Sequence, residues 1–231
     1  MNPVLVALDT PDLESARSLA KSVRPYVGGY KVGLELMMAA GPRSVAEIAQ
    51  LGMPVFADAK LHDIPNTVKG AAGQIARQGA RWITVHAAGG RAMLEAAIEG
   101  AASTGSADCG ILAVTVLTSL DTADLEAAGL GSDITAISLS LARHAAESSA
   151  EGVVCSPNEV ADIAAANLGL ITVTPGIRPA GTSGHDQKRT ATPESALQAG
   201  ADLLVIGRAI TAADDPAAAA ARIAATLPAI S

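Results

Sequence analysis

Three charged residues, Asp58, Lys60 and Asp63, lie close together in the segment VFADAKLHDIP. If this segment forms a strand over Val55–Lys60, alternate side chains share a face. Asp58 and Lys60 then point to the same side as Phe56, whereas small apolar residues suit packing against helices on the other side. A carboxylate and an ammonium held together in a partly closed cavity perturb each other's pKa values, as acid–base chemistry requires. A structural ion pair that caps the core is the alternative.

Two further charges lie where apolar runs end. Asp9 ends the run Val4–Asp9, and Lys31 lies in the next run, Tyr30–Leu34. Removing four charges from water is costly unless they pair alternately, and apolar packing could replace a purely structural quartet at little loss of stability. The alternation of lysine and aspartate therefore favours a functional array. Asp63 lies beyond its own strand, so it could reach the site of a neighbouring subunit.

A Gly-x-Arg motif and a Gly-Arg motif in the C-terminal part of the sequence are suited to binding an anion. The sequence reads TPGIR up to Arg178 and VIGR up to Arg208, each at the end of an apolar run. Glycine lets backbone N–H groups approach a phosphate, and a guanidinium binds phosphate oxygens bidentately. The polar stretch Pro179–Thr190 lacks periodicity and predicts a lid over the ligand. For either arginine taken alone, a solvated surface position is the alternative.

The elements that must position these residues alternate along the chain. Short β-branched runs predict strands over Val4–Asp9, Tyr30–Leu34, Val55–Lys60, Trp82–His86, Ile111–Val116, Gly152–Cys155, Leu170–Thr174 and Leu203–Ile206. Stretches of helical periodicity between them predict helices over Asp12–Val23, Val45–Leu51, Val68–Gln78, Arg91–Ala102, Ile134–Ser148, Pro157–Ala166, Pro193–Ala199 and Pro216–Leu227.

This alternation predicts an α/β protein, a closed (β/α)8 TIM barrel that forms a single domain over residues 1–231. Eight strand–helix units in 231 residues amount to about 29 residues each, close to the length of a βαβ repeat. An open doubly wound sheet is the alternative, but no G-x-G-x-x-G motif follows the first predicted strand. In such barrels the catalytic groups and phosphate sites lie at the carboxyl ends of the strands, where the charged residues described above occur.

Composition narrows the choice of partners and compartment. The chain has a net charge of −7, a pI near 5.0 and 2% aromatic residues. These values argue against a nucleic acid bound through its phosphates or by base stacking. No apolar run of about 18 residues predicts a membrane span, and the N-terminus does not resemble a signal peptide. Cys109 and Cys155 lie in apolar runs, as is typical of reduced thiols. We therefore expect a cytoplasmic protein without a membrane partner.

The motifs taken together resemble the bacterial branch of the orotidine 5′-phosphate decarboxylase family. The segment from Asp58 to Ile64 follows the D-x-K-x-x-D-I pattern of that family. Further matches are ALD ending at Asp9, KVG beginning at Lys31, VLTS around Thr118, TPGIRP, the pair Asp186-Gln187, and VIGR. This resemblance extends from the first predicted strand to the last. It implies conversion of orotidine 5′-phosphate to UMP and carbon dioxide in pyrimidine biosynthesis, without cofactor or metal, by a homodimer with shared active sites.

The resemblance also implies a role for each matched residue. Lys60 would protonate the ring carbon that loses its carboxylate, and Asp58 would lie against that carboxylate. Lys31 and the partner subunit's Asp63 would complete the charged array. Asp9 would contact the ribose, and Thr67 would reach the same ribose from across the dimer. Thr118 would bind the pyrimidine, with Pro175 and Ile177 as the adjoining wall. The phosphate would be held by Arg178, Gln187, Gly207 and Arg208.

Two other functions remain open. Metal-dependent sugar-phosphate enzymes on similar barrels share the D-x-K-x-x-D pattern but carry an acidic metal ligand at the position of Lys31, where a cation opposes a divalent metal. His86 is one histidine rather than a ligand cluster, and we expect it to be hydrogen-bonded in the core. A phosphate-binding barrel without catalysis is the other alternative, although binding alone does not require charges to be crowded together.

Overall fold

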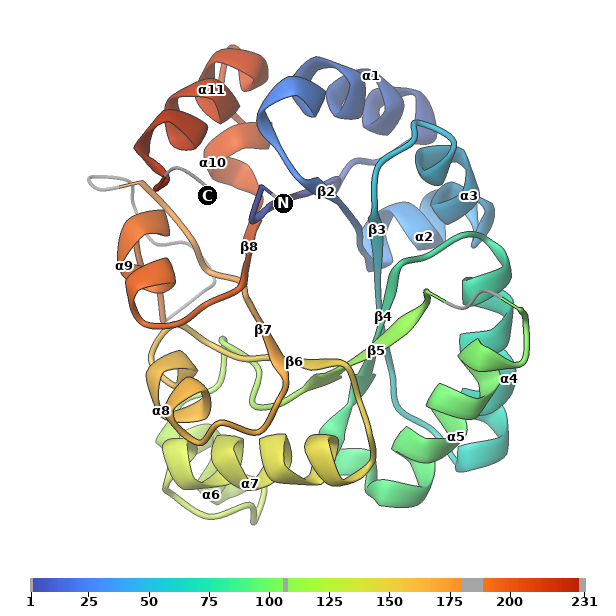
Figure 1. Cartoon of the computed structure of the whole chain (residues 1–231), viewed down its shortest axis with the longest axis vertical. Coiled ribbons are helices and arrows are strands. Elements are labelled where there is room, and N and C mark those ends of the chain that lie inside the picture. Colours follow the sequence, from blue (N-terminus) through green and yellow to red (C-terminus); the bar gives the residue numbers. More distant parts are fainter. Residues whose placement is uncertain (1, 106–107, 180–188, 229–231) are drawn as a thin grey trace.

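A closed parallel barrel forms the centre of the molecule. The computed structural model describes residues 2–105, 108–179 and 189–228. The strands follow one another around the barrel in chain order, and the last pairs with the first, as Figure 1 shows. They are β1 (Val4–Ala7), β2 (Gly29–Val32), β3 (Val55–Leu61), β4 (Trp82–His86), β5 (Gly110–Val114), β6 (Gly152–Val154), β7 (Ile171–Thr174) and β8 (Leu203–Ile206). The predicted (β/α)8 barrel is confirmed.

Helices surround the barrel as an outer layer (Figure 1). They are α1 (Leu13–Val23), α2 (Leu34–Ala40), α3 (Arg43–Ala49), α4 (Pro65–Arg77), α5 (Arg91–Ala102), α6 (Thr122–Ala127), α7 (Ile134–Glu147), α8 (Val160–Ala165), α9 (Pro193–Gln198), α10 (Arg208–Thr211) and α11 (Pro216–Thr226). Two 3-10 turns, Arg24–Tyr26 and Ala87–Gly89, complete the helical elements of the described residues. Within these residues, no helix combines the length and the apolar character that crossing a membrane requires.

The observed boundaries differ from the predicted ones next to the site. Leu34, which we expected to end a strand, is the first residue of α2, and Asp9 lies two residues beyond the end of β1 at Ala7. The helices α2, α6 and α10 were not predicted, and they have 7, 6 and 4 residues. Segments this short complete at most two helical turns and show little hydrophobic periodicity, although α3, α8 and α9, which are no longer, were predicted.

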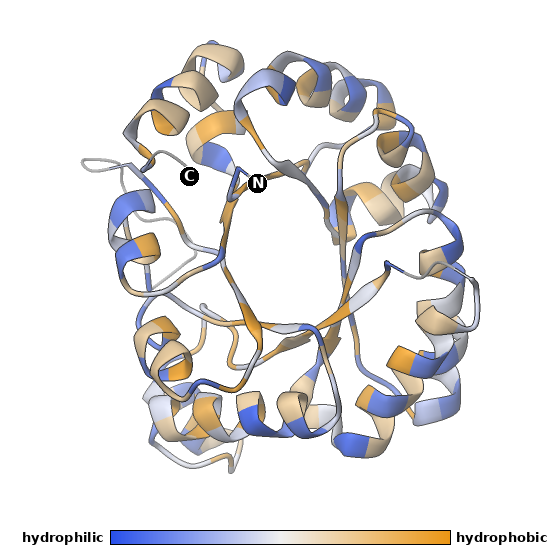
Figure 2. Ribbon diagram, viewed as in Figure 1, coloured by the Kyte–Doolittle hydropathy of each residue, from blue (hydrophilic) through white to orange (hydrophobic). Residues whose placement is uncertain are grey.

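The barrel is filled by side chains up to its carboxyl-terminal rim. Residues alternate along each strand, so that Leu5 points into the barrel whereas Val4 and Val6 pack against the helices. The buried inner cluster comprises Leu5, Ala7, Phe56, Trp82, Leu112, Val173, Leu203 and Val205. Figure 2 shows hydrophobic residues along the strands and on the helices around them. Apolar packing thus forms a floor beneath the rim.

The amino-terminal end of the barrel carries a charged cluster. Glu151 accepts hydrogen bonds from Arg81 Nη1 at 2.7 Å and from Trp82 Nε1 at 2.9 Å. The guanidinium carbon of Arg81 lies 4.6 Å from the centre of the Trp82 ring. Burial alone would raise the pKa of Glu151, but the hydrogen bonds from Arg81 and Trp82 outweigh it, and the pKa is lowered. Since this end of a TIM barrel serves stability rather than chemistry, we assign the cluster a structural role.

Candidate active site

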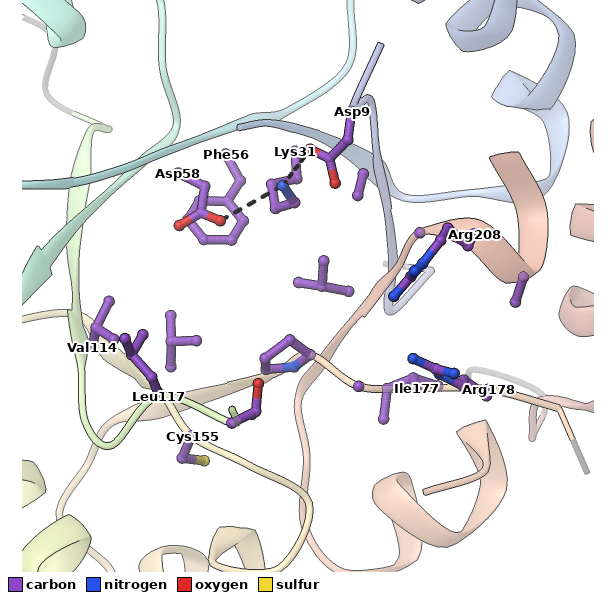
Figure 3. Close-up of a pocket in the computed structure, with 18 of the residues that line it drawn as sticks. Asp9, Lys31, Phe56, Asp58, Val114, Leu117, Cys155, Ile177, Arg178 and Arg208 are labelled. Carbon is purple, nitrogen blue, oxygen red and sulfur yellow. Dashed lines mark hydrogen bonds and ion pairs between the residues drawn. The ribbon is translucent and has the colours of Figure 1, made fainter. Parts of the chain in front are cut away.

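A cavity of about 550 Å³ opens at the carboxyl ends of the strands (Figure 3). Its walls come from β1, β2, β3, β5, β6 and β8 and from the segments that follow β1, β5, β6, β7 and β8, and Phe56 lies among its lining residues. A volume of about 300–1,000 Å³ is typical of sites for small organic ligands. The predicted site residues in its lining are Asp9, Lys31, Asp58, Lys60, Thr118, Pro175, Ile177, Arg178, Gly207 and Arg208.

Four charged side chains form a chain of alternating sign along one wall of the cavity. Lys31 Nζ donates a hydrogen bond to Asp9 Oδ1 at 2.9 Å and lies 3.6 Å from Asp58 Oδ2. Lys60 Nζ donates to the same oxygen of Asp58 at 2.7 Å. Because β1, β2 and β3 are neighbours, three consecutive strand ends bring these groups together. The side chains of Lys31 and Asp58 are only 10% and 11% exposed, so their pairing replaces most of their contact with water.

Asp58 keeps its charge in this buried position. Burial alone would raise the pKa of its carboxyl group. The positive charges of Lys31 and Lys60, together with hydrogen bonds from Lys60 and Thr84, outweigh that effect and hold the pKa below its ordinary value of 3.8. Asp58 is therefore an anion at neutral pH, with the ammonium groups of Lys31 and Lys60 near its Oδ2.

The backbone at Lys60 departs from the regular alternation that the sequence predicts. The register between β3 and β4 shifts between Ala57 and Leu61, and Lys60 has a φ of +47°. Its N–H donates to Thr84 Oγ1 at 2.9 Å, and the same hydroxyl donates to Asp58 Oδ1 at 2.9 Å. The side chain of Lys60 nevertheless lines the cavity. Thr84 is absent from the predicted site, because its role comes from a contact with Asp58, 26 residues away along the chain, that its local sequence does not show.

Two arginines line the cavity on the side of β7 and β8, away from Asp58 (Figure 3). Arg178 follows β7, and its backbone N–H donates to the carbonyl of Ala191 at 2.9 Å. Arg208 is the first residue of α10, directly after Gly207. Both guanidinium groups can donate paired hydrogen bonds to an anion. Arg178 and Arg208 thus lie on one side of the cavity, and the array of lysine and aspartate lies on another part of its wall.

A buried ion pair that the sequence did not reveal supports the loop after β5. Arg189 Nη1 lies 2.6 Å from Glu159 Oε1, and the two side chains are 8% and 3% exposed. Arg189 Nη2 also donates to the carbonyl oxygen of Leu117 at 2.8 Å. Leu117 and Thr118 line the cavity, so this pair fixes the backbone next to a predicted substrate contact. Neither partner belongs to a motif with a fixed spacing, which is why pattern analysis missed it.

Two predicted residues that the structure describes, Asp63 and Thr67, do not line the cavity of this chain. Asp63 is exposed, and its carboxylate accepts a hydrogen bond from the N–H of Ile64 at 2.7 Å. Thr67, in the first turn of α4, is exposed as well, and Ile64 between them is 68% exposed. Gln187, with most of the predicted lid, lies outside the described residues.

The other candidate ligands and nucleophiles do not form a second site. His86 is half-buried and stacks on His62, with ring centres 5.2 Å apart, rather than lying in the core as expected. Burial, followed by the charges of His62 and Lys60, lowers the pKa of His86. Burial raises the pKa of Cys155, in the cavity wall, to about 12, so its thiol is not a nucleophile at neutral pH. Among the described residues, no three His, Cys, Asp or Glu side chains converge as metal ligands would.

Comparison with known proteins agrees with the resemblance of the motifs. The family model described as orotidine 5′-phosphate decarboxylase / HUMPS family matches residues 2–223. An orotidine 5′-phosphate decarboxylase of Anaeromyxobacter sp. (strain K) is 52% identical over 225 residues, which is 97% of each chain. That of Thermobifida fusca (strain YX) is 50% identical over 227 residues, 97% of this chain and 95% of the relative.

Solved structures match the fold as well. The crystal structure of orotidine 5′-phosphate decarboxylase from Lactobacillus acidophilus superposes with a TM-score of 0.84 at 38% identity, over 96% of this chain and 97% of the other. The enzyme from Pyrococcus horikoshii OT3 gives a TM-score of 0.76 at 28% identity, over 96% and 97%. The agreement of sequence and fold extends over nearly the whole chain. The chain therefore belongs to the orotidine 5′-phosphate decarboxylase / HUMPS family.

Proposed function

We propose that this protein decarboxylates orotidine 5′-phosphate to UMP and carbon dioxide, the reaction named by its relatives and a step of pyrimidine biosynthesis. The observation that carries the proposal is the chain of contacts Asp9–Lys31–Asp58–Lys60 in a cavity that two arginines also line. The substrate has one anion at its pyrimidine ring and another at its phosphate. The cavity offers charged partners suited to both.

In the proposed step, the bond between the ring carbon and its carboxylate breaks, and carbon dioxide leaves as a neutral molecule. The electron pair stays on the ring carbon and takes a proton from the ammonium of Lys60, which gives UMP. No cofactor is proposed, so the electron pair must be stabilised by the field of the site. The ammonium of Lys60 favours the developing negative charge and supplies the proton that ends the step.

Asp58 contributes through repulsion that disappears during the reaction. An ionised carboxylate about 4 Å from the carboxylate of the substrate raises its free energy by roughly 4 kcal/mol at an effective dielectric constant of 20. The repulsion vanishes as carbon dioxide leaves, so it acts on the ground state more than on the transition state. Enzymes lower barriers by about 8–23 kcal/mol, so this one pair supplies a fraction of what is needed. Binding of the distant phosphate must provide part of the remainder through orientation.

We assign the remaining contacts from the family resemblance. Arg178, Gly207 and Arg208 hold the phosphate together with Gln187, and Asp9 contacts the ribose. Thr118 binds the pyrimidine, with Pro175 and Ile177 as the adjoining wall. The whole of residues 1–231 is proposed to form one cytoplasmic domain.

We further propose a homodimer in which each site uses residues of both subunits. Asp63 and Thr67 are exposed at the end of β3 and the start of α4, and the exposed Ile64 lies between them. An apolar side chain flanked by polar ones is suited to an interface. The partner subunit's Asp63 would complete the charged array, and the partner subunit's Thr67 would contact the ribose.

Replacing the proton donor should abolish most of the activity. Lys60→Ala should lower kcat with orotidine 5′-phosphate by about 100-fold or more, because general acid catalysis contributes about 10²–10⁴-fold. The assay follows the ultraviolet absorbance of the substrate with and without EDTA. Lys21→Ala, at an exposed position on α1, is the matched control and should behave as wild type. Unchanged kcat in Lys60→Ala would remove its assigned role, and loss of wild-type activity in EDTA would favour the metal-dependent alternative.

Removing one arginine should weaken binding of the phosphate selectively. Arg208→Ala should raise the dissociation constant of UMP by about 10- to 100-fold, since a hydrogen bond to a charged group contributes about 1.5–3 kcal/mol. Calorimetric titration with UMP and with uridine measures the selectivity. Uridine, which has no phosphate, should bind both proteins equally, and Arg222→Ala, exposed on α11, should leave both affinities unchanged. Equal losses for UMP and uridine would rule out a phosphate contact.

Shared sites predict complementation between inactive subunits. Asp63→Asn and Lys60→Ala homodimers should each be nearly inactive. After subunit exchange, half of the dimers are hybrids with one intact site, so about a quarter of wild-type activity should return. Light scattering and separately tagged subunits verify that exchange has occurred. Hybrids that form without any recovery would contradict the sharing of Asp63.

A further inference from the structure

Thr84 links the two charged residues of β3 without lining the cavity. It lies in β4 and is fully buried, with 0% exposure. Its hydroxyl accepts a hydrogen bond from the backbone N–H of Lys60 and donates one to Asp58 Oδ1, each at 2.9 Å. A hydroxyl has a single proton, and Thr84 donates it to Asp58. The hydroxyl oxygen therefore uses a lone pair to accept the hydrogen bond from the backbone N–H of Lys60. The two hydrogen bonds form a directional bridge from Lys60 through Thr84 to Asp58.

The backbone conformation of Lys60 requires such a partner. A φ of +47° is in the left-handed region, which is uncommon and strained for a residue with a side chain. The register shift between Ala57 and Leu61 takes Lys60 out of the regular ladder between β3 and β4. A buried N–H without a partner is destabilising, so a different acceptor is needed at this point. The hydroxyl of Thr84 provides it.

This arrangement determines which oxygen of Asp58 faces each neighbour. Thr84 binds Oδ1, while Lys60 Nζ lies 2.7 Å and Lys31 Nζ 3.6 Å from Oδ2. The carboxylate therefore cannot rotate without breaking the hydrogen bond to Thr84. The same residue holds the strained backbone from which the side chain of Lys60 extends. The relative position of the proposed proton donor and its neighbouring carboxylate thus depends on one hydroxyl group.

We propose that Thr84 is a positioning residue for the decarboxylation: through its hydroxyl it keeps Lys60 in its left-handed conformation and Asp58 in the orientation that the reaction needs. Thr84 acts through these two residues and does not touch the substrate. The inference rests on the proposed function for its kinetic consequences. Its geometric consequence, the dependence of the contact between Lys60 and Asp58 on the hydroxyl, is independent of the reaction.

The test compares three variants in the full-length protein. Thr84→Val keeps the branched shape and removes the hydroxyl, whereas Thr84→Ser keeps the hydroxyl. Thr172→Val is the matched control, because Thr172 is also a buried strand threonine, and its hydroxyl binds the carbonyl of Gly200 before β8, at the other end of the barrel. We expect kcat of Thr84→Val to fall by about 100-fold, the loss typical of a catalytic group misplaced by about 1 Å. KM should change by less than about threefold, since the substrate contacts remain.

Thr84→Ser should retain kcat within about threefold of wild type, and Thr172→Val should do the same, because neither change removes the bridge. Wild-type kcat in Thr84→Val, an equal loss in Thr84→Ser, or an equal loss in Thr172→Val would each overturn the proposal. If Thr84→Val does not fold, Thr84→Ala removes the same hydroxyl with less crowding and is judged by the same outcomes.

A crystal structure of Thr84→Val separates this inference from the proposed function. We expect Lys60 to leave the left-handed region and its Nζ to move away from Asp58 Oδ2, and an unchanged position of both would overturn the inference. This comparison does not depend on turnover. Wild-type protein that fails to consume orotidine 5′-phosphate would contradict the proposed function alone, and the structural comparison would still decide the role of Thr84.

Discussion

A carboxylate that stays ionised while nearly buried between two ammonium groups is the interaction on which the site depends. Asp58 is 11% exposed at its side chain, and an isolated anion in such a place would be strongly destabilising. Lys31 and Lys60 compensate its charge at Oδ2, and Asp9 compensates the charge of Lys31. Within the array, removing Lys31 leaves Asp9 without an opposite charge, and removing Asp58 does the same to Lys60. The array is therefore a unit rather than a set of separate ion pairs.

The barrel explains how this unit is held together. Adjacent parallel strands end at the same rim, so β1, β2 and β3 deliver the members of the array in order. The apolar cluster below, with Phe56 and Leu112 among its members, excludes water from beneath the charges and strengthens their interaction. On the far wall, the buried pair of Arg189 and Glu159 supports the loop after β5. The charges at the opposite end of the barrel, Arg81 and Glu151, stabilise the fold and are separate from the site.

The sequence was sufficient to predict features that depend on hydrophobic periodicity and on the residue types at the ends of predicted strands. Apolar runs separated by helical stretches are sufficient to predict the barrel. Charged residues at the ends of those runs are sufficient to predict that Asp9, Lys31 and Asp58 lie close together. The helix α10 was not predicted, because a segment of 4 residues is too short to show hydrophobic periodicity. The left-handed Lys60 escaped because a register shift arises from the pairing of two strands, and neither strand shows it alone.

Contacts between segments that are distant along the chain could not be predicted for a related reason. Thr84 and Arg189 look ordinary in their local sequence, and their importance comes from Asp58 and Glu159, which lie 26 and 30 residues away along the chain. Asp63 and Thr67 are exposed, and their part in a composite site comes from the family resemblance rather than from a contact within this chain. The prediction of a shared site therefore remains a proposal.

The ionisation of Asp58 in the folded protein can be measured directly. Carbon-13 NMR of the aspartate carboxyl groups, with the Asp58 signal assigned from its absence in Asp58→Asn, follows this group through an acid titration. We expect Asp58 to stay ionised as the pH falls from neutral, and its titration midpoint to lie below the ordinary value of 3.8. A midpoint above that value, or a protonated Asp58 at neutral pH, would contradict it.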